Sequence, residues 1–366
     1  MAESTRLVDL VQDKLDSFVA TREQHLGTIS SDLVPFVDAS RFLLSGGKRF
    51  RALFCYLGWD AVSSASESDR ASEHESVIAV ASGLEAFHAA ALVHDDLVDN
   101  SDTRRGEPAA HRRYETMHRA AGWIGDAEPF GRSAALLLGD LLLGWSDELV
   151  DDGLDALASR SAARAARTEF TAMRNEVTYG QYLDLLEEHS WNRRHEHELL
   201  ERAHRVIVFK SAKYSVEAPL AIGAALGGAS TDQLASLREF GLPLGIAFQL
   251  RDDLLGVFGD PEVTGKPAGD DLREGKRTVL VALAREGLSA SSSRLLDELL
   301  GDPELTADQI TMLQRSLHAS GAVDAVERLI TEHTLVATRA LESSTCNARV
   351  VEQLTELAHT VSQRAH

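Results

Sequence analysis

The sequence is poor in residues that build covalent or metal cross-links. Its 366 residues include only two cysteines, Cys55 and Cys346, so neither a disulfide framework nor a cysteine-based zinc site is expected. Only eight prolines are present, and Ala, Leu, Glu and Arg recur throughout. Few helix breakers and many strong helix formers predict a mostly helical protein.

Two further absences limit where the chain acts and what it binds. The longest apolar run is interrupted by Glu85 and His88 and falls short of the roughly 18 residues that span a membrane. Residues 1–18 space acidic among apolar side chains, as in an amphipathic helix and unlike a secretion signal. The formal net charge of −20 disfavours nucleic acid as a partner. We therefore expect a cytoplasmic protein with no stable membrane insertion.

Apolar residues recur with a helical period along most of the chain. No window shows the strict alternation of a strand, so an all-α fold without strands is expected. Pro219 and Pro243 fall inside helical patterns and are expected to kink or end those helices. The predicted helices cover roughly 4–27, 31–45, 49–64, 72–99, 132–151, 155–188, 195–227, 231–258, 276–287 and several segments between 290 and 365.

Two long segments rich in Gly, Pro and Asp separate these helices. They cover residues 100–131 and 259–275, and both are long for connections within a domain, which favours a functional role. No Pro/Ser-rich linker divides the chain. We therefore predict one large helical bundle domain over residues 1–366, with the C-terminal helices of 290–365 as scaffold.

An aspartate pair occurs inside two separate apolar helices, in ALVHDDLVD (91–99) and FQLRDDLLG (248–256). A buried carboxylate pair is costly unless a cation or a partner neutralises it. A single such pair is compatible with a satisfied core feature. Two pairs on separate long helices favour a metal site.

The first pair has the spacing of a magnesium site. Asp95 and Asp99 are four residues apart and share a helix face, whereas Asp96 points elsewhere. Magnesium binds one or two carboxylates, keeps several waters and completes its shell with phosphate oxygens. Together with Asp252 from the second pair, these side chains predict a clamp for a diphosphate. A solvated acidic face fits poorly, because apolar residues surround the first pair.

Basic residues gather locally in this acidic chain. The clusters are Lys48-Arg49-Arg51, Arg104-Arg105 and Arg112-Arg113, and they indicate a small anionic ligand. Arg104 and Arg105 follow the first aspartate pair within a loop, where guanidinium groups can grip phosphate with two hydrogen bonds.

Six blocks of sequence resemble, in order, the conserved blocks of the polyprenyl synthetase family, the trans-isoprenyl diphosphate synthases. The similarity spans roughly residues 40–285 and is strongest to short-chain bacterial and archaeal members that make geranylgeranyl diphosphate. The blocks are GGKRFR (46–51), EAFHAAALVHDDLVDNSDTRRGEP (85–108), LLGD (137–140), GQYLDL (180–185), FKSAKY (209–214) and GIAFQLRDDLLGVFGD with TGKPAGDDLREGKRT (245–278).

The resemblance implies an isoprenoid-synthase-type bundle with a central active-site cavity, acting as a homodimer. It implies joining of isopentenyl diphosphate to dimethylallyl, geranyl or farnesyl diphosphate with three Mg²⁺ ions. The metal ligands would be Asp95, Asp99 and Asp252, with Asp253 in support. The remaining catalytic residues would be Arg104 and Lys210.

The same resemblance assigns the substrate sites. The positions implied for isopentenyl diphosphate are Lys48, Arg51, His88 and Arg105. Those implied for the allylic diphosphate and the departing pyrophosphate are Arg104, Lys210, Ser211, Gln249, Lys266 and Lys276.

Two positions depart from the common family pattern. Gly256 stands at the fifth position of the second aspartate motif, where many members have Asp. An outer-shell oxygen would then come from Asp260, Asp270 or Asp271. Ser211 replaces a common Thr and keeps the hydroxyl.

Product length is predicted from the helix that carries the first motif. Asp95, Ala91, Phe87 and Gly83 follow at intervals of four, and Ala90 and Ala91 leave the first turn open. Phe87 is the first bulky group, about 12 Å from Asp95 along the helix axis. A floor there favours a C20 product over C15. The alternative is that Phe87 simply packs in the core.

Other functions remain open at this point. A different position of the floor would give farnesyl or geranylfarnesyl diphosphate as the product. A class I terpene cyclase shares the aspartate-rich site but needs no second diphosphate site. A non-catalytic subunit of a heteromeric synthase would have lost carboxylates or basic residues. A ferritin-like di-metal bundle would need Glu and Glu-x-x-His sets that are not seen near the aspartate pairs.

Overall fold

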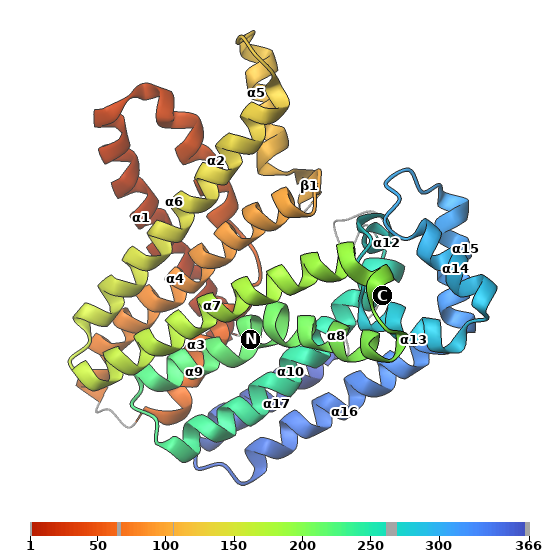
Figure 1. Ribbon diagram of the computed structural model, residues 1–366. Helices are drawn as coiled ribbons and strands as arrows, with labels where there is room; N and C mark the ends of the chain where they lie inside the picture. The colour runs from red at the N-terminus through yellow and green to blue at the C-terminus, as the bar shows by residue number, and fades with distance from the viewer. Residues whose placement is uncertain (1, 64–66, 105, 261–268, 363–366) are drawn as a thin grey trace. The chain divides into compact units, whose positions relative to one another are not determined.

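The computed structural model describes residues 2–63, 67–104, 106–260 and 269–362, with side chains for 6–63, 73–104, 106–260 and 269–360. Helices dominate these residues, which confirms the all-α fold class (Figure 1). The chain forms two compact units. Unit 1 comprises Met1–Thr168 and Pro219–Ala229, and unit 2 comprises Glu169–Ala218 and Ser230–His366. The expectation of one domain over the whole chain stays a prediction.

Unit 1 contains the helices that precede and follow the first aspartate motif. They are α1 (Ala2–Ile29), the 3₁₀ turn η1 (Ser31–Leu33), α2 (Val34–Leu44), α3 (Phe50–Val62), α4 (Glu67–Val98), α5 (Ala110–Ala121), α6 (Ala127–Ala156), the start of α7 (Arg160–Ser190) and most of α9 (Ala218–Leu226).

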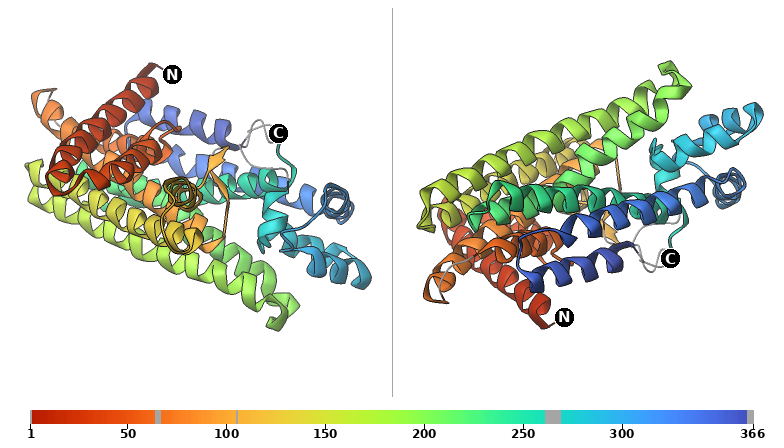
Figure 2. Two further views of the ribbon diagram at one scale, coloured as in Figure 1. Left: turned by 90° about the horizontal axis from the view of Figure 1, so that it is seen from above. Right: turned by 90° about the horizontal axis from the view of Figure 1, so that it is seen from below.

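Helix α4 is the core helix of unit 1 and lies along α6 (Figures 1 and 2). The two backbones approach closely because glycines lie between them: a Cβ on Gly83 would be 2.5 Å from Val150 Cγ2, and one on Gly153 would be 2.6 Å from Ser76 O. The segment Glu73–Val98 is long and apolar enough to cross a membrane, yet 83% of its most apolar window is buried. Burial of this kind is typical of a core helix.

Unit 2 contains the second motif and the C-terminal helices. Its elements are the rest of α7, the 3₁₀ turns η2 (Trp191–Arg193) and η3 (Glu196–Glu198), α8 (Leu199–Val206), the π-helix η4 (Ile207–Glu217), α10 (Thr231–Phe258), α12 (Asp270–Glu274), α13 (Val279–Gly287), α14 (Ala290–Leu299), α15 (Ala307–Ala319), α16 (Ala322–Glu342) and α17 (Ala348–Ser362). Helix α10 packs against both η4 and α16 and supplies Leu250 and Leu254 to the buried core.

The predicted helices are largely confirmed, but three details differ. The loop predicted for 100–131 contains α5, whose buried face carries His111, Glu115 and His118. Polar side chains on the inward face hid its helical period. The same loop contains a two-residue antiparallel pair, β1 (Thr103–Arg104) with β2 (Glu107–Pro108), so the expectation of no strands is wrong there. A hairpin this short shows no alternation in sequence.

The third detail concerns the two prolines. Pro219 falls at the start of α9, directly after the π-helix η4, so the change of helix type coincides with the missing proline N–H. Pro243, by contrast, lies inside α10 without ending it. The predicted helix boundary is therefore confirmed at Pro219, and Pro243 does not end its helix.

Candidate active site

The first aspartate motif ends helix α4 in unit 1. The backbone N–H of Asp99 donates to Asp95 O at 2.8 Å, so the helical spacing continues one residue beyond the assigned end of α4. Asp95 and Asp99 therefore share a face, as predicted. Arg132 of α6 contacts the C-terminal end of α4. Its guanidinium donates to Leu97 O at 2.9 Å and to Asn100 Oδ1 at 2.8 Å.

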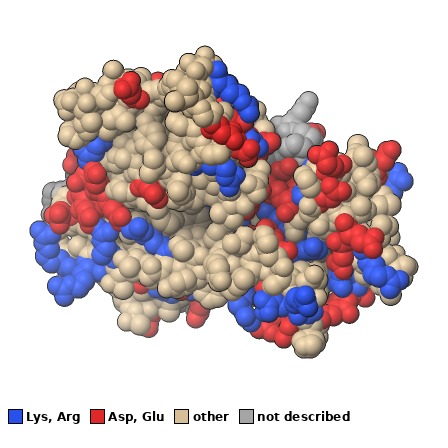
Figure 3. Space-filling model, turned by 45° about the horizontal axis from the view of Figure 1, so that its top comes forward, with Lys and Arg blue, Asp and Glu red and all other residues tan. Residues whose placement is uncertain are grey.

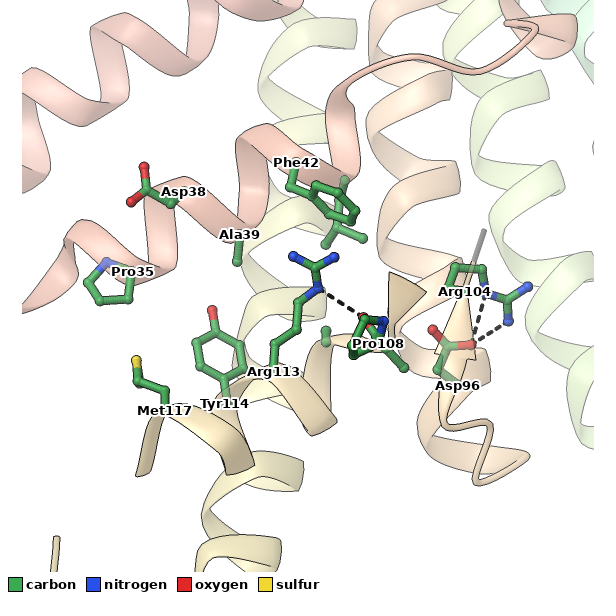
Figure 4. A pocket seen from close by; sticks show the side chains of 13 residues that line it. Pro35, Asp38, Ala39, Phe42, Asp96, Arg104, Pro108, Arg113, Tyr114 and Met117 are labelled. Carbon is green, nitrogen blue, oxygen red and sulfur yellow. Dashed lines mark hydrogen bonds and ion pairs between the residues drawn. The ribbon is translucent and has the colours of Figure 1, made fainter. Parts of the chain in front are cut away.

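Arg104 lies on β1 of the short hairpin and contacts the aspartate motif. Its Nε donates to Asp96 Oδ1 at 2.9 Å (Figure 4). Its second terminal nitrogen lies 3.4 Å from Asp95 Oδ2. Gly106, with a φ of 75°, adopts the left-handed conformation that turns the chain between the two strands. Asp96 is 3% exposed, so Arg104 neutralises the carboxylate that faces inward. Asp95 and Arg104 are thus brought together as predicted.

The three basic residues of the GGKRFR block differ in how deeply they are buried. Arg49, only 5% exposed, donates to Gln12 Oε1 at 2.7 Å and lies 3.5 Å from Glu85 Oε2, and it holds the turn before α3. Lys48 is exposed and Arg51 half-buried, on the same turn and the first residues of α3. Arg49 is thus buried and paired inside the protein, and the binding of an anionic ligand by Lys48 and Arg51 stays a prediction.

The predicted product-length residues occupy α4 above the motif. Phe87 and Ala90 are buried, at 5% and 0% exposed, and Ala91 is half-buried. A row of residues four apart winds round a helix by about 40° per step, so Phe87 lies about 80° round from Asp95, whereas His88 lies about 20° away. Gly83, the residue of this row farthest from Asp95, lies against α6, where Ser146 Oγ donates to Gly83 O at 2.7 Å.

Unit 2 holds the second aspartate motif on α10. Asp252 is exposed, whereas Asp253 is 6% exposed and accepts from Gln249 Nε2 at 2.8 Å. Burial raises the pKa of Asp253 to about 8; the Gln249 hydrogen bond opposes this rise, and the nearby Asp271 and Asp252 add to it. Gln249, predicted to contact the allylic diphosphate, thus orients the second carboxylate of this motif.

Gly256 allows another carboxylate close to α10. A Cβ on Gly256 would lie 2.0 Å from Asp271 Oδ2, so the side chain of Asp271 rests against the fifth position of the motif. Lys276 Nζ lies 3.7 Å from Asp271 Oδ1 and 2.7 Å from Glu274 Oε2. Of the three predicted sources of an outer-shell oxygen, Asp271 is the one placed beside Gly256.

Lys210 and Ser211 lie on the π-helix η4, an unusual helix type that often occurs at functional sites. Lys210 Nζ lies 2.5 Å from Asp184 Oδ2, and both side chains are largely buried, at 18% and 12% exposed. Asp184 was not predicted as a site residue, although it belongs to the GQYLDL block. Its signal in the sequence is its place four residues after Gly180, which puts both on one face of α7.

Gly180 sets the distance between α7 and η4. A Cβ at this position would lie 2.3 Å from Lys210 N and 2.4 Å from Phe209 C, so only glycine permits this approach. The Lys210–Asp184 pair therefore depends on a close backbone contact one helical turn away. Two predicted residues, Arg105 and Lys266, lie outside the described residues.

The donor set fits magnesium. Each aspartate motif by itself offers carboxylate oxygens, the ligand type that Mg²⁺ prefers: Asp95 and Asp99 in unit 1, and Asp252 in unit 2. Within the described residues, no three His, Cys, Asp or Glu side chains form a ready-made metal cluster. Magnesium in phosphate-binding sites relies on one or two carboxylates and on substrate oxygens, so a complete protein cage is not required. Figure 3 shows small clusters of acidic and of basic side chains beside one another on the visible surface.

Comparison with known proteins identifies the class. Residues 36–317 match the family model described as polyprenyl synthetase. The chain belongs to the polyprenyl synthetase family and is a prenyltransferase. The match extends beyond the predicted range of 40–285 and includes α14 and part of α15.

Curated relatives and solved structures agree with this assignment. The short chain isoprenyl diphosphate synthase of Methanothermobacter thermautotrophicus is 29% identical over 97% of this chain and 99% of its own. The geranylgeranyl diphosphate synthase of Methanosarcina mazei is 30% identical, covering 85% and 86% of the two chains. A crystal structure of geranylgeranyl pyrophosphate synthase from Corynebacterium glutamicum, complexed with isoprenyl diphosphate and magnesium, has a TM-score of 0.90 at 38% identity, over 98% of this chain and 99% of that one.

Proposed function

We propose that this prenyltransferase condenses isopentenyl diphosphate head-to-tail with an allylic diphosphate, in a Mg²⁺-dependent reaction that yields geranylgeranyl diphosphate. The observation that carries the proposal is the contact of Arg104 with Asp95 and Asp96, which puts a guanidinium group beside a carboxylate that we propose as a metal ligand. The magnesium-bound Corynebacterium structure, similar over nearly the whole chain, supports the same reaction.

The proposed reaction breaks the C–O bond of the allylic diphosphate and forms a C–C bond. Bound Mg²⁺, held by Asp95, Asp99 and Asp252, would supply positive charge that stabilises the departing pyrophosphate. Arg104 and Lys210 add fixed positive charge for the same group. Asp184 holds the ammonium of Lys210 in place through the 2.5 Å contact.

The second substrate supplies the electrons for the new bond. Lys48, Arg51, His88 and Arg105 would bind isopentenyl diphosphate beside the allylic cation, so that its double bond attacks the cationic carbon. The adduct then loses a proton to the released pyrophosphate. Ser211, Gln249, Lys266 and Lys276 complete the proposed allylic site, Gln249 by orienting Asp253. Water must be excluded, because it would quench the cation.

We propose C20 as the main product, with Phe87 as the floor and Ala90 and Ala91 leaving space above it. Phe87 is buried on α4 two turns from Asp95, which supports this role. The 80° winding between the two residues allows the alternative, a core residue with no influence on length. Farnesyl or geranylfarnesyl diphosphate would then be the product.

We further propose a cytoplasmic homodimer acting on small diphosphates. The surface of unit 1 around the start of α6 supports dimerisation, because several apolar side chains there are exposed. Their exposed fractions are 50% for Trp123, 97% for Ile124, 51% for Leu136 and 59% for Leu137.

A panel of primers tests the reaction. The protein is incubated with isopentenyl diphosphate and with dimethylallyl, geranyl or farnesyl diphosphate, and products are resolved by length. Elongation that stops at C20 supports the proposal. Pyrophosphate release from one allylic substrate alone would indicate a terpene cyclase. No turnover of any mixture by folded protein would indicate a non-catalytic subunit.

A further inference from the structure

Three of the four residues 46–49, in the turn between α2 and α3, have a left-handed backbone. Gly46 and Gly47 have φ values of 64° and 88°, and Arg49 has a φ of 50°. Glycine adopts this conformation freely, whereas a residue with a Cβ keeps it only where the surrounding structure enforces it. Such residues gather at ligand clamps and active sites. The backbone of Arg49 therefore needs a physical cause.

The side chain of Arg49 supplies that cause. Its buried guanidinium donates to Leu44 O, at the end of α2, and to Gln12 Oε1 of α1 at 2.7 Å. It also lies 3.5 Å from Glu85 Oε2 of α4. Glu85 is buried as well, so the two charges compensate each other away from water. One side chain thus ties the turn to three helices of unit 1.

Glu85 extends this anchor to α3. Its Oε1 accepts from the backbone N–H of Ala52 at 3.0 Å, in the first turn of α3, while its Oε2 faces Arg49. A single buried carboxylate therefore fixes both the left-handed turn and the start of α3 against α4.

Three residues proposed to bind isopentenyl diphosphate lie on the segments that this anchor joins. Lys48 lies in the turn and Arg51 in the first turn of α3. His88 lies on α4, about one helical turn after Glu85. Because each residue comes from a different segment, a shift of the turn or of α3 would change the spacing of all three.

We propose that Arg49 and Gln12 are positioning residues for isopentenyl diphosphate. The guanidinium of Arg49 touches no substrate. It holds the left-handed turn in place, and with it the spacing of Lys48 and Arg51. Gln12 lies on α1, outside the residues 36–317 that match the family model, so the N-terminal helix contributes to substrate affinity. The inference rests on the proposed function, because it assigns these residues to the same substrate.

Gln12→Ala tests the inference by steady-state kinetics of the full chain, with isopentenyl or geranyl diphosphate varied in turn. The variant leaves the Arg49–Glu85 pair in place and should therefore fold. Its KM for isopentenyl diphosphate should rise about 3- to 10-fold, a fraction of the effect of one hydrogen bond to a charged group. Its kcat and its KM for geranyl diphosphate should stay within about 2-fold of the wild type. Gln24→Ala, an exposed position on α1, is the matched control and should change neither KM.

Arg49→Lys is the second variant. Lysine keeps a positive charge opposite Glu85, but its single amine lacks the planar fork that reaches several acceptors at once. Its KM for isopentenyl diphosphate should rise at least as far as that of Gln12→Ala, with the same small effect on kcat. Thermal melting shows whether each variant is folded, and Gln12→Ala decides the test if Arg49→Lys does not fold.

The outcomes separate this inference from the proposed function. Elongation by the wild type, with an unchanged KM for isopentenyl diphosphate in the folded variants, would overturn the inference alone. An equal rise in the KM for geranyl diphosphate would also overturn it, since the effect would then be general damage to the structure. No elongation by the wild type with any primer would overturn the proposed function and this inference with it.

Discussion

Replacing Gly180 with alanine should separate α7 from η4 and displace Lys210. The added Cβ would lie 2.3 Å from Lys210 N, and the two atoms must move apart by about 1 Å to reach the 3.4 Å of ordinary contact. The obstructing atoms, Lys210 N and Phe209 C, belong to the backbone. A change of side-chain rotamer therefore cannot relieve the clash, and η4 itself must shift.

The expected cost has two parts. Overpacking of this kind destabilises a protein by about 1–3 kcal/mol. A displacement of about 1 Å at a charge-stabilising group can lower the rate on the order of 100-fold. Because Lys210 would act on the departing pyrophosphate, we expect the loss in kcat to exceed any change in KM for isopentenyl diphosphate. Steady-state kinetics and urea unfolding of Gly180→Ala measure both effects.

Gly27→Ala is the matched control. Gly27 lies within α1, and nothing would be within 4 Å of its added Cβ, so this variant should keep wild-type activity and stability. If Gly180→Ala also retained wild-type kcat and unfolding free energy, the close approach of α7 to η4 would not position Lys210, and the reasoning would be refuted.

Three further predictions concern product length, pH and assembly. Phe87→Ala should lengthen the product by removing the floor; a stability loss of about 3–5 kcal/mol with unchanged chain length would instead identify Phe87 as a core residue. Burial lowers the pKa of His111, so the unfolded chain binds a proton that the folded protein does not, and stability should fall as pH drops below about 6.5. His111→Leu should flatten that dependence in urea unfolding between pH 5.5 and 7.5, and an unaltered slope would show that other groups cause it. Leu137→Glu should shift sedimentation from dimer toward monomer, whereas Leu295→Glu, an exposed position on α14, should not; monomeric wild-type protein at working concentration would contradict the dimer.

Where local chemistry determines an element, the sequence predicts it well. Helix α10 was expected at 231–258 and is found at Thr231–Phe258. Ser230 and Gln233 form a reciprocal capping box at its start, and the helix ends before Gly259. Likewise, the four-residue spacing of Asp95 and Asp99 places them on one face because both lie on one continuous helix.

Features that depend on distant packing escaped prediction. Helix α5 was missed because His111 and Glu115 occupy its buried face, where Arg112 lies 2.7 Å from Glu115. The π-helix η4 has no periodic signature that separates it from an α-helix over its 11 residues. The role of Asp184 appears only when η4 brings Lys210 to it. Sequence patterns report neighbours along the chain, whereas the contact of Lys210 with Asp184 joins residues 26 positions apart.

The central claim is magnesium-dependent condensation through both aspartate motifs. Its most direct test compares elongation by the wild type, Asp95→Ala and Asp252→Ala, with Mg²⁺ and with EDTA. Asp155→Ala, an exposed position at the end of α6, serves as the control. We predict that the wild type and the control elongate only with Mg²⁺, and that each motif variant loses at least about 100-fold in kcat. Elongation that continues in EDTA, or at wild-type rate in either motif variant, would contradict the account.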